Sequence, residues 1–310
     1  MDIYQIDAIA SAVVEKLSPK CSVIFDELCL KFLEHRRHKR SFRMDESRMR
    51  NYLLPAFGGM TLSDITPFLV ADLHKKIGKD HPYQANRVVQ QLSCMFRLAQ
   101  SWRMFPRDGE NPGMATDLYP EISRDRFLTE QEIERASVHI NSCRKQHYRV
   151  LFWLFLLTAL RHDELVGAKW GDIDWENWLF KLPAKRSKNG KPHFVPLPAE
   201  ALALFHRLPQ RGEYIFSTDG AKPLNCTAVW KAWNRVRIKA GLSDVRIHDL
   251  RRTVGSLLAQ SGEPLPLIAD LLNHADMKST LIYARIYKPQ VRIALQQHAS
   301  RIARFIPRHI

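Results

Sequence analysis

The stretch "RIHDLRRT" places His248 and Arg251 three residues apart, so on a helix the two side chains would share a face. Arginine can clamp two phosphate oxygens in a planar fork, and histidine can release or accept a proton near neutral pH. The pair therefore suits chemistry on a phosphate ester. The plainer interpretation is a surface helix with ordinary polar residues, and the pair alone does not decide between the two.

A second arginine follows the most apolar run of the chain. Arg161 comes directly after "VLFWLFLLTAL", and Glu164 lies three residues further on. An arginine at the end of a buried segment needs a partner, which Glu164 could provide. One interpretation is a structural ion pair. The other is a second phosphate clamp, in which Glu164 braces Arg161.

Lysines gather at the tip of a predicted β-hairpin. In "NWLFKLPAKRSKNGKPHFVPLP" two extended runs are joined through Asn189-Gly190, a dipeptide typical of hairpins. Lys185, Lys188 and Lys191 lie near this tip. A mobile lysine there could reach into a cleft and act as a general acid, whereas a solvated basic turn is the plainer alternative.

Near the C-terminus, "LLNHADMKSTLIYARIY" places His274 nine residues before Tyr283, with Tyr287 one helical turn later. A tyrosine hydroxyl can serve as a nucleophile, but aromatic residues more often pack in a core. The segment alone leaves open whether one tyrosine reacts or both line a helix face.

Taken together and in this order, these stretches resemble the tyrosine recombinases, the phage-integrase family. The resemblance covers about residues 126–287. It implies six active-site residues, which are Arg161, Lys188, His248, Arg251, His274 and Tyr283. In this assignment Tyr283 is the nucleophile, and Tyr287 is expected to pack.

The family's chemistry gives each group a role. The two arginines would bind the phosphate, and nearby cations would stabilise the phenolate of Tyr283. His248 would accept the phenol proton, and Lys188 would protonate the leaving 5′-oxygen.

Two turns depart from the family pattern. Asn273 precedes the second histidine, and Ala159 precedes the leucine of the first arginine motif, whereas many family members have glycine at these positions. Asparagine tolerates left-handed backbone angles better than most residues. We therefore expect the turn at Asn273 to be retained, and neither change removes a catalytic side chain.

The resemblance implies a site-specific DNA recombinase or integrase that cleaves and rejoins double-stranded DNA through a 3′-phosphotyrosine intermediate. It implies no cofactor and no metal in the reaction, a homotetramer on two recombination sites, and accessory DNA-bending proteins as further partners. Two alternatives stay open. One is a related enzyme that resolves, inverts or relaxes DNA, as a type IB topoisomerase does; the other is a DNA-binding protein of this fold without catalysis.

Composition agrees with a nucleic-acid partner. The 310 residues carry a formal net charge of +15, and surface lysine and arginine release counterions from nucleic acid. No apolar run reaches the roughly 18 residues of a membrane span, and the N-terminus lacks a secretion signal. Five cysteines without a CxxC pair favour a reducing cytoplasm, as in a bacterial or phage-encoded protein.

The sequence patterns around these residues predict a mostly α fold with a small β-hairpin or sheet. A helical core-binding domain is expected to precede an α+β catalytic domain. We expect residues 1–20 to form a short N-terminal segment, 21–105 the helical DNA-binding domain, 106–123 a linker, and 124–310 the catalytic domain. The catalytic domain would end in a tail helix, which docks either on a neighbouring protomer or on its own domain.

Local signals predict several helix ends. Thr129 with Glu132 forms a capping-box pattern. A further helix is expected to begin with Thr61 or Thr66 as its cap and Pro67 at its start. Pro55, followed by a glycine pair, predicts a helix stop.

Overall fold

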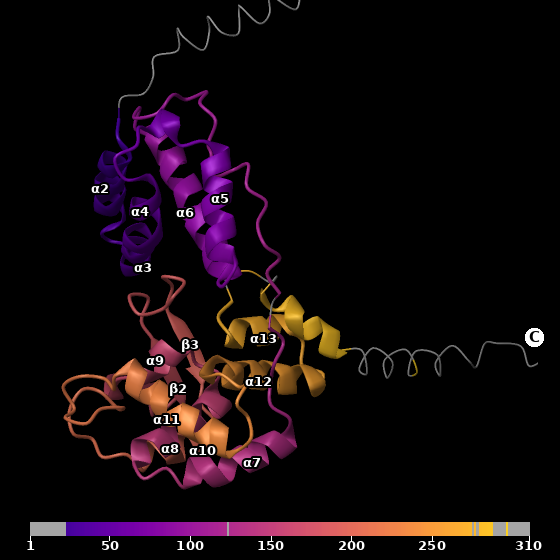
Figure 1. Cartoon of the computed structure of the whole chain (residues 1–310). Coiled ribbons are helices and arrows are strands. Elements are labelled where there is room, and N and C mark those ends of the chain that lie inside the picture. Colours follow the sequence, from indigo (N-terminus) through magenta and orange to yellow (C-terminus); the bar gives the residue numbers. More distant parts are fainter. Residues whose placement is uncertain (1–22, 123, 275, 277–278, 288–295, 297–310) are drawn as a thin grey trace, which may run out of the picture. The chain divides into compact units, whose positions relative to one another are not determined.

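The computed structural model describes residues 23–122, 124–274, 276, 279–287 and 296. The chain divides into two compact units, residues 1–123 and 124–310, and each is described here by itself (Figure 1). The predicted segment 1–20 and the predicted tail helix beyond residue 287 lie outside the described residues.

The first unit is helical. Its helices are α2 Phe25–Arg36, α3 Phe42–Arg48, α4 Leu54–Phe57, α5 Pro67–Gly78 and α6 Pro82–Ser101. Their apolar faces enclose a core in which Phe25, Phe32 and Phe96 are fully buried. Thr66 caps α5 as predicted, because its hydroxyl accepts a hydrogen bond from the Leu69 N–H.

The helix predicted to stop at Pro55 and the following glycine pair continues past Pro55 and ends directly before Gly58. A π-helical turn, Met49–Leu53, joins α3 to α4, and Pro55 lies in the first turn of α4. The helix is continuous across this turn, since the Leu54 N–H donates to the Met49 carbonyl, and the local change from α- to π-helical hydrogen bonds lies directly before the proline. The last helical residue is Phe57.

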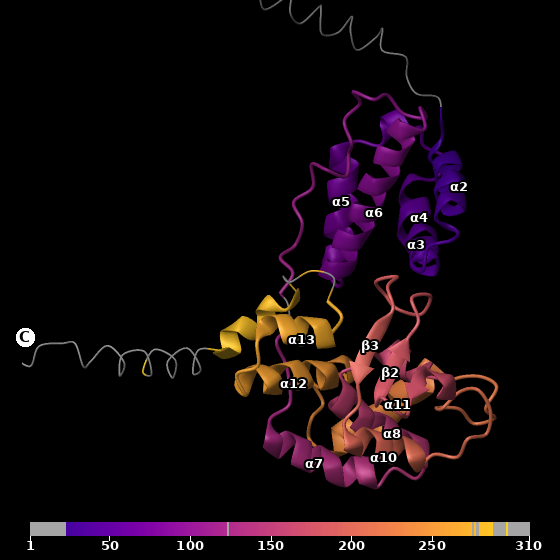
Figure 2. The same ribbon diagram turned by 180° about the vertical axis from the view of Figure 1, so that it is seen from behind.

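The second unit combines helices with a small sheet. Its helices are α7 Glu130–Asn141, α8 Gln146–Thr158, α9 His162–Val166, α10 Ala199–His206, α11 Cys226–Lys239, α12 Ile247–Gln260 and α13 Leu265–Leu271, and a 3₁₀ segment spans Leu281–Tyr287. The apolar run of the sequence forms α8, which packs against α10, α11 and α12 in the core. Figure 2 shows α12 beside α13 from behind.

The sheet is antiparallel and has the order β1-β2-β3, with strands Ile173–Asp174, Leu179–Leu182 and His193–Pro196. Phe180 pairs with Val195, and both side chains are buried. These observations confirm the predicted fold class, which is mostly α with a small sheet.

The connection between β2 and β3 is not a tight Asn-Gly turn. Residues 183–192 form a longer loop, in which the Ser187 N–H donates to the Pro183 carbonyl and the Gly190 N–H donates to the Ser187 carbonyl. Gly190 has a φ of +68°, which favours glycine. The loop is therefore built from two successive turns, and it carries Lys188.

The capping box of α7 is present as predicted. The Thr129 hydroxyl accepts from the Glu132 N–H, and the Glu132 carboxylate accepts from the Thr129 N–H. None of the described helices is long and apolar enough to cross a bilayer.

Candidate active site

Arg161 is the N-cap residue of α9, where the chain leaves the buried helix α8. Its Nη1 donates to Glu164 Oε1 at 2.9 Å, and its backbone N–H donates to Glu164 Oε2 at 2.9 Å. Its Nη2 donates to the carbonyls of Asn273, at 2.6 Å, and Leu272, at 3.3 Å. Glu164 is only 5% exposed, so it braces the guanidinium against the turn at residues 272–273.

Arg251 lies on α12 and is 4% exposed. Its guanidinium donates to the carbonyls of Ala159 and Leu272. Desolvation, and after it the charge of Arg161, lowers the pKa of Arg251 to about 10. The side chain therefore remains positively charged at neutral pH while being held from two sides.

Two strained turns supply carbonyls to the arginines. Ala159 has a φ of +53° and Asn273 a φ of +44°, so both keep the left-handed backbone that glycine adopts more easily. The Ala159 carbonyl accepts from Arg251, and the Asn273 carbonyl accepts from Arg161. The two departures from the family pattern thus lie where the backbone meets the guanidinium groups.

The two histidines are neutral at pH 7. His274 Nδ1 is 2.8 Å from Thr280 Oγ1, and its pKa is lowered to about 4 by desolvation and then by Arg251. His248 lies in the first turn of α12, and its pKa is also lowered to about 4, by desolvation and then by Arg252. His248 is exposed at the surface, so solvent screens part of these charge effects. A neutral imidazole can accept a proton, which a protonated one cannot.

Tyr283 is buried, with 3% of its surface exposed. It belongs to the 3₁₀ segment Leu281–Tyr287, which packs against α12 and α13. Its ring lies over Gly255, since a Cβ added to that glycine would be 2.8 Å from the Tyr283 Cζ. The ring therefore needs a residue without a side chain beneath it.

The pKa of Tyr283 is raised, mainly by burial, while Arg251 and Arg252 act in the opposite direction. The sequence predicts that nearby cations stabilise the phenolate. Here burial outweighs them, so the phenol keeps its proton. The side chain of Tyr287 lies outside the described residues.

Lys188 is exposed on the loop between β2 and β3, and both of its neighbours are anchored. Asn189 Nδ2 donates to the Asn273 carbonyl at 2.8 Å and to Asn273 Oδ1 at 2.9 Å. Asn273 Nδ2 donates to Ser187 Oγ at 3.3 Å. The loop is thereby tied to the turn that precedes His274.

The structure brings most of the predicted residues together. Arg161 and Arg251 share the Leu272 carbonyl, and Tyr283 packs in one cluster with Ala159 and Leu272. The charges of both arginines lower the pKa of His274 and of His248. Lys188 does not contact this group; it lies on the neighbouring, anchored loop.

Sequence reasoning missed Gly255 and Asn189. An isolated glycine within a helical pattern commonly has a packing reason, so "RRTVGSLL" carried a signal for Gly255. The tie from Asn189 to Asn273 has no local signal, because it joins residues far apart in the sequence. Outside this site, His162, Asp163 and Cys226 form a possible metal-ligand group among the described residues.

Known proteins resemble this chain over most of its length. The integrase of Salmonella phage P22 is 24% identical and aligns with 88% of this chain and 79% of its own. The tyrosine recombinase XerA of Pyrococcus furiosus is 26% identical over 81% of this chain and 86% of its own. The prophage integrase IntA of Escherichia coli is 36% identical, over 72% of this chain and 55% of its own.

Solved structures share the fold. A lambda integrase dimer bound to a COC′ core site has a TM-score of 0.70 at 20% identity and covers 88% of this chain and 80% of its own. A lambda integrase tetramer bound to a Holliday junction has a TM-score of 0.69 at 20% identity, covering 89% and 88%. The Tn1549 transposon integrase in complex with circular intermediate DNA has a TM-score of 0.68 at 19% identity, covering 84% and 95%.

Fold and relatives define a tyrosine-type site-specific recombinase. The family model described as the phage integrase family matches residues 126–289, which is more than half of the chain. The protein therefore belongs to the phage integrase family.

Proposed function

We propose that this recombinase cleaves and rejoins double-stranded DNA with Tyr283 as its nucleophile. The observation that carries the proposal is the convergence of Arg161, Arg251 and His274 around the turn at residues 272–274, in one cluster with Tyr283. The Tyr283 oxygen attacks the phosphorus, and the bond from phosphorus to the 5′-oxygen breaks. The products are a 3′-phosphotyrosyl bond and a free 5′-hydroxyl.

The arginines would stabilise the charge that develops on the non-bridging oxygens. Each guanidinium has five N–H donors, and the carbonyl contacts of Arg251 use only some of them. The remaining donors are available to phosphate. Because both groups are already fixed, they need no reorganisation when the transition state forms.

Protons would move between the remaining groups. His248, neutral at pH 7, accepts the phenol proton, and Lys188 gives a proton to the departing 5′-oxygen. Thr280 holds Nδ1 of His274, which leaves Nε2 for a phosphate oxygen. The phosphotyrosyl bond keeps the energy of the broken ester, so rejoining needs no ATP and no metal.

The proposed assembly is a homotetramer on two recombination sites. Exchange of two pairs of strands requires four cleavages, and each protomer has one proposed nucleophile. Lambda integrase, which shares the fold, forms a tetramer on a Holliday junction. The net charge of +15 favours DNA as the partner. Accessory DNA-bending proteins and a cytoplasmic location complete the proposal, since the relatives include phage and prophage integrases.

A nicked suicide substrate, from which the cleaved fragment diffuses away, tests the nucleophile. Wild-type protein should accumulate a covalent protein–DNA adduct, and Tyr283→Phe should bind the DNA without forming it. Tyr287→Phe is the matched control and should form the adduct. Adduct formation by Tyr283→Phe, together with its loss in Tyr287→Phe, would show that the assignment is wrong.

A further inference from the structure

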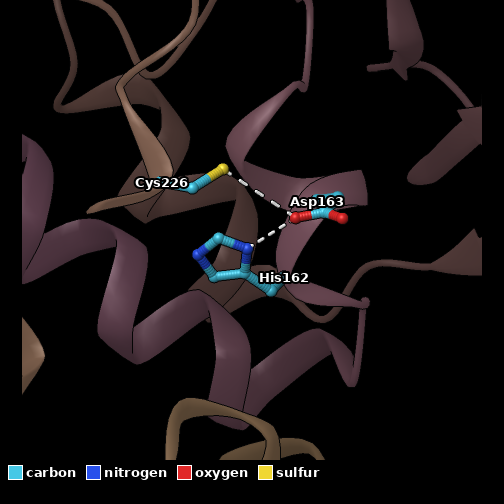
Figure 3. Close-up of side chains that lie close together, drawn as sticks. All are labelled: His162, Asp163 and Cys226. Atoms are coloured by element: carbon cyan, nitrogen blue, oxygen red, sulfur yellow. Dashed lines mark hydrogen bonds and ion pairs between the residues drawn. The ribbon is translucent and has the colours of Figure 1, made fainter. Parts of the chain in front are cut away.

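Three potential metal ligands of different kinds meet beside the catalytic cluster. They are His162 and Asp163, at the start of α9, and Cys226, at the start of α11 (Figure 3). His162 Nδ1 is 2.7 Å from Asp163 Oδ1, and Cys226 Sγ is 3.9 Å from the same oxygen. One ligand atom from each residue lies within 4.8 Å of the others.

These distances are close to those of a bound ion. Zinc bonds of about 2.0–2.1 Å to nitrogen or oxygen and about 2.3 Å to sulfur place tetrahedral ligands about 3.3–3.6 Å apart. The His162–Asp163 distance is shorter than this and the Cys226–Asp163 distance is longer. The three ligand atoms lie within 4.8 Å of one another, so side-chain shifts of up to about 1 Å would bring them to the spacing of zinc ligands.

The donor set selects the class of metal. A thiolate, an imidazole and a carboxylate suit Zn²⁺ and similar borderline ions, whereas Mg²⁺ and Ca²⁺ prefer oxygen ligands alone. Burial and the Asp163 carboxylate raise the pKa of Cys226, so the free site holds a thiol. Binding would convert the S–H bond into a metal–sulfur bond and release the thiol proton to solvent.

Access to the ligands is open. A pocket of about 670 Å³ is lined by residues that include His162, Cys226, Trp230 and His248. The Asp163 side chain is 89% exposed, so an ion can enter and keep a water molecule as its fourth ligand. Because Arg161 directly precedes His162, an ion here would join the element that carries Arg161 to α11.

We propose that His162, Asp163 and Cys226 bind a divalent ion of the Zn²⁺ class, which ties the N-terminus of α9 to the N-terminus of α11. The site is separate from the proposed phosphoryl-transfer chemistry, which needs no metal. The ion would stabilise the first turn of α9, whereas the Arg161 side chain is already held by Glu164 and by the Asn273 carbonyl without it.

Cobalt binding by the full-length protein tests this proposal. Anaerobic titration of the metal-free protein with Co²⁺ should produce the near-ultraviolet band of a cobalt–thiolate bond, and Zn²⁺ should abolish it by displacement. Zn²⁺ should also raise the melting temperature, since an ion that binds only the folded protein stabilises it. Cys226→Ser should lose the thiolate band, and Asp163→Asn should weaken Zn²⁺ binding by about tenfold or more.

Cys143→Ser is the matched control, because Cys143 is a free cysteine of the same unit and is not part of the group. It should bind Co²⁺ as the wild type does. A thiolate band that persists in Cys226→Ser, or that disappears equally in Cys143→Ser, would overturn the site. So would the lack of any thiolate band in wild-type protein that still forms the covalent DNA adduct.

DNA cleavage separates this site from the active site. With excess chelator, wild-type protein and Cys226→Ser should form the covalent adduct at equal rates. Loss of adduct with chelator, restored by Zn²⁺, would contradict the separation of the two sites. An error in the assignment of Tyr283 would be detected separately, as a covalent adduct formed by Tyr283→Phe. That assay does not depend on metal.

Discussion

The pocket that holds Arg251 and the loop that carries Lys188 adjoin the same turn, residues 272–274, but they are built differently. Arg251 is 4% exposed, and backbone carbonyls from two turns fix its guanidinium. Lys188 is exposed, whereas its neighbours Ser187 and Asn189 and the nearby Arg186 are anchored. A group that stabilises charge works best when it is fixed in advance. A group that delivers a proton must reach its acceptor, so its loop is positioned while its side chain stays free.

The largest expected effect lies in the fixed pocket. Arg251→Ala should reduce the rate of covalent adduct formation by roughly a hundredfold or more, the scale of losing one preorganised donor. DNA affinity, measured by titration at fixed salt, should fall far less, because many basic residues share the phosphate contacts. Arg252→Ala is the neighbouring control and should lose much less rate. Equal losses of rate and affinity in Arg251→Ala would contradict a transition-state role.

The exposed loop should respond to a change of leaving group. Lys188→Ala should slow cleavage of normal DNA by about a hundredfold, in the range of general-acid catalysis. A substrate with sulfur at the 5′-bridging position should restore the rate, since a thiolate leaves without a proton. Arg251→Ala should not be restored to the same degree. If Lys188→Ala is not rescued, Lys185→Ala and Lys191→Ala on the same loop are the next variants to measure.

Removing the side-chain hydrogen bonds that join Asn273 to the β2–β3 loop should have a smaller effect on the cleavage rate. Asn273→Gly keeps a residue that accepts the φ of +44° but removes the side-chain contacts to Ser187 and Asn189. We expect a roughly tenfold slower cleavage, the scale of one or two hydrogen bonds of about 1 kcal/mol each. The sulfur substrate should again restore the rate, because these hydrogen bonds position Lys188. Asn189→Ala should show the same loss of cleavage rate and the same rescue. If the sulfur substrate does not restore the rate of Asn273→Gly, Asn273 does not act by positioning Lys188.

The smallest expected effect is on the protonation of His274. Burial, and after it the charge of Arg251, lowers the pKa of His274 to about 4. Arg251→Ala should therefore raise this pKa toward 6.5, whereas Lys188→Ala should leave it unchanged, as measured by NMR titration of His274. An equal shift in both variants would remove the distinction between the two regions.

The same shift has a consequence for stability. Between pH 4 and 6.5 the unfolded chain binds more protons at His274 than the folded chain does, so the free energy of unfolding should increase with pH across this window. Denaturant unfolding at several pH values would measure it, and His274→Gln should reduce the slope.

Much of the fold follows from local sequence signals. The capping box at Thr129, the cap at Thr66 and the apolar run of α8 each depend on residues within one or two turns, and each lies where the sequence predicts it. The predicted stop at Pro55 and the glycine pair falls at the glycines, because a π-helical turn directly before Pro55 changes the hydrogen-bond pattern and the helix continues past the proline. No local rule signals that turn.

The site was predictable by motif but not by environment. The order of arginine, lysine, histidine and tyrosine motifs predicted the candidate residues, while the burial of Tyr283 depends on Gly255 and Leu272 in other elements. The direction of the Tyr283 pKa shift follows from that burial, so it could not be derived from the motif. The sequence likewise predicts a hairpin through Asn189-Gly190 but not the anchoring of its loop, because the partner Asn273 lies far along the chain.

Because Tyr283 packs over Gly255, the hydroxyl of the proposed nucleophile is covered in this conformation. With 3% of its surface exposed and its pKa raised, the phenol is shielded from any phosphodiester that approaches from solvent. If Tyr283 is the nucleophile, we expect attack on DNA to require a movement of residues 281–287 away from α12. A protomer that binds DNA without this movement would not cleave it.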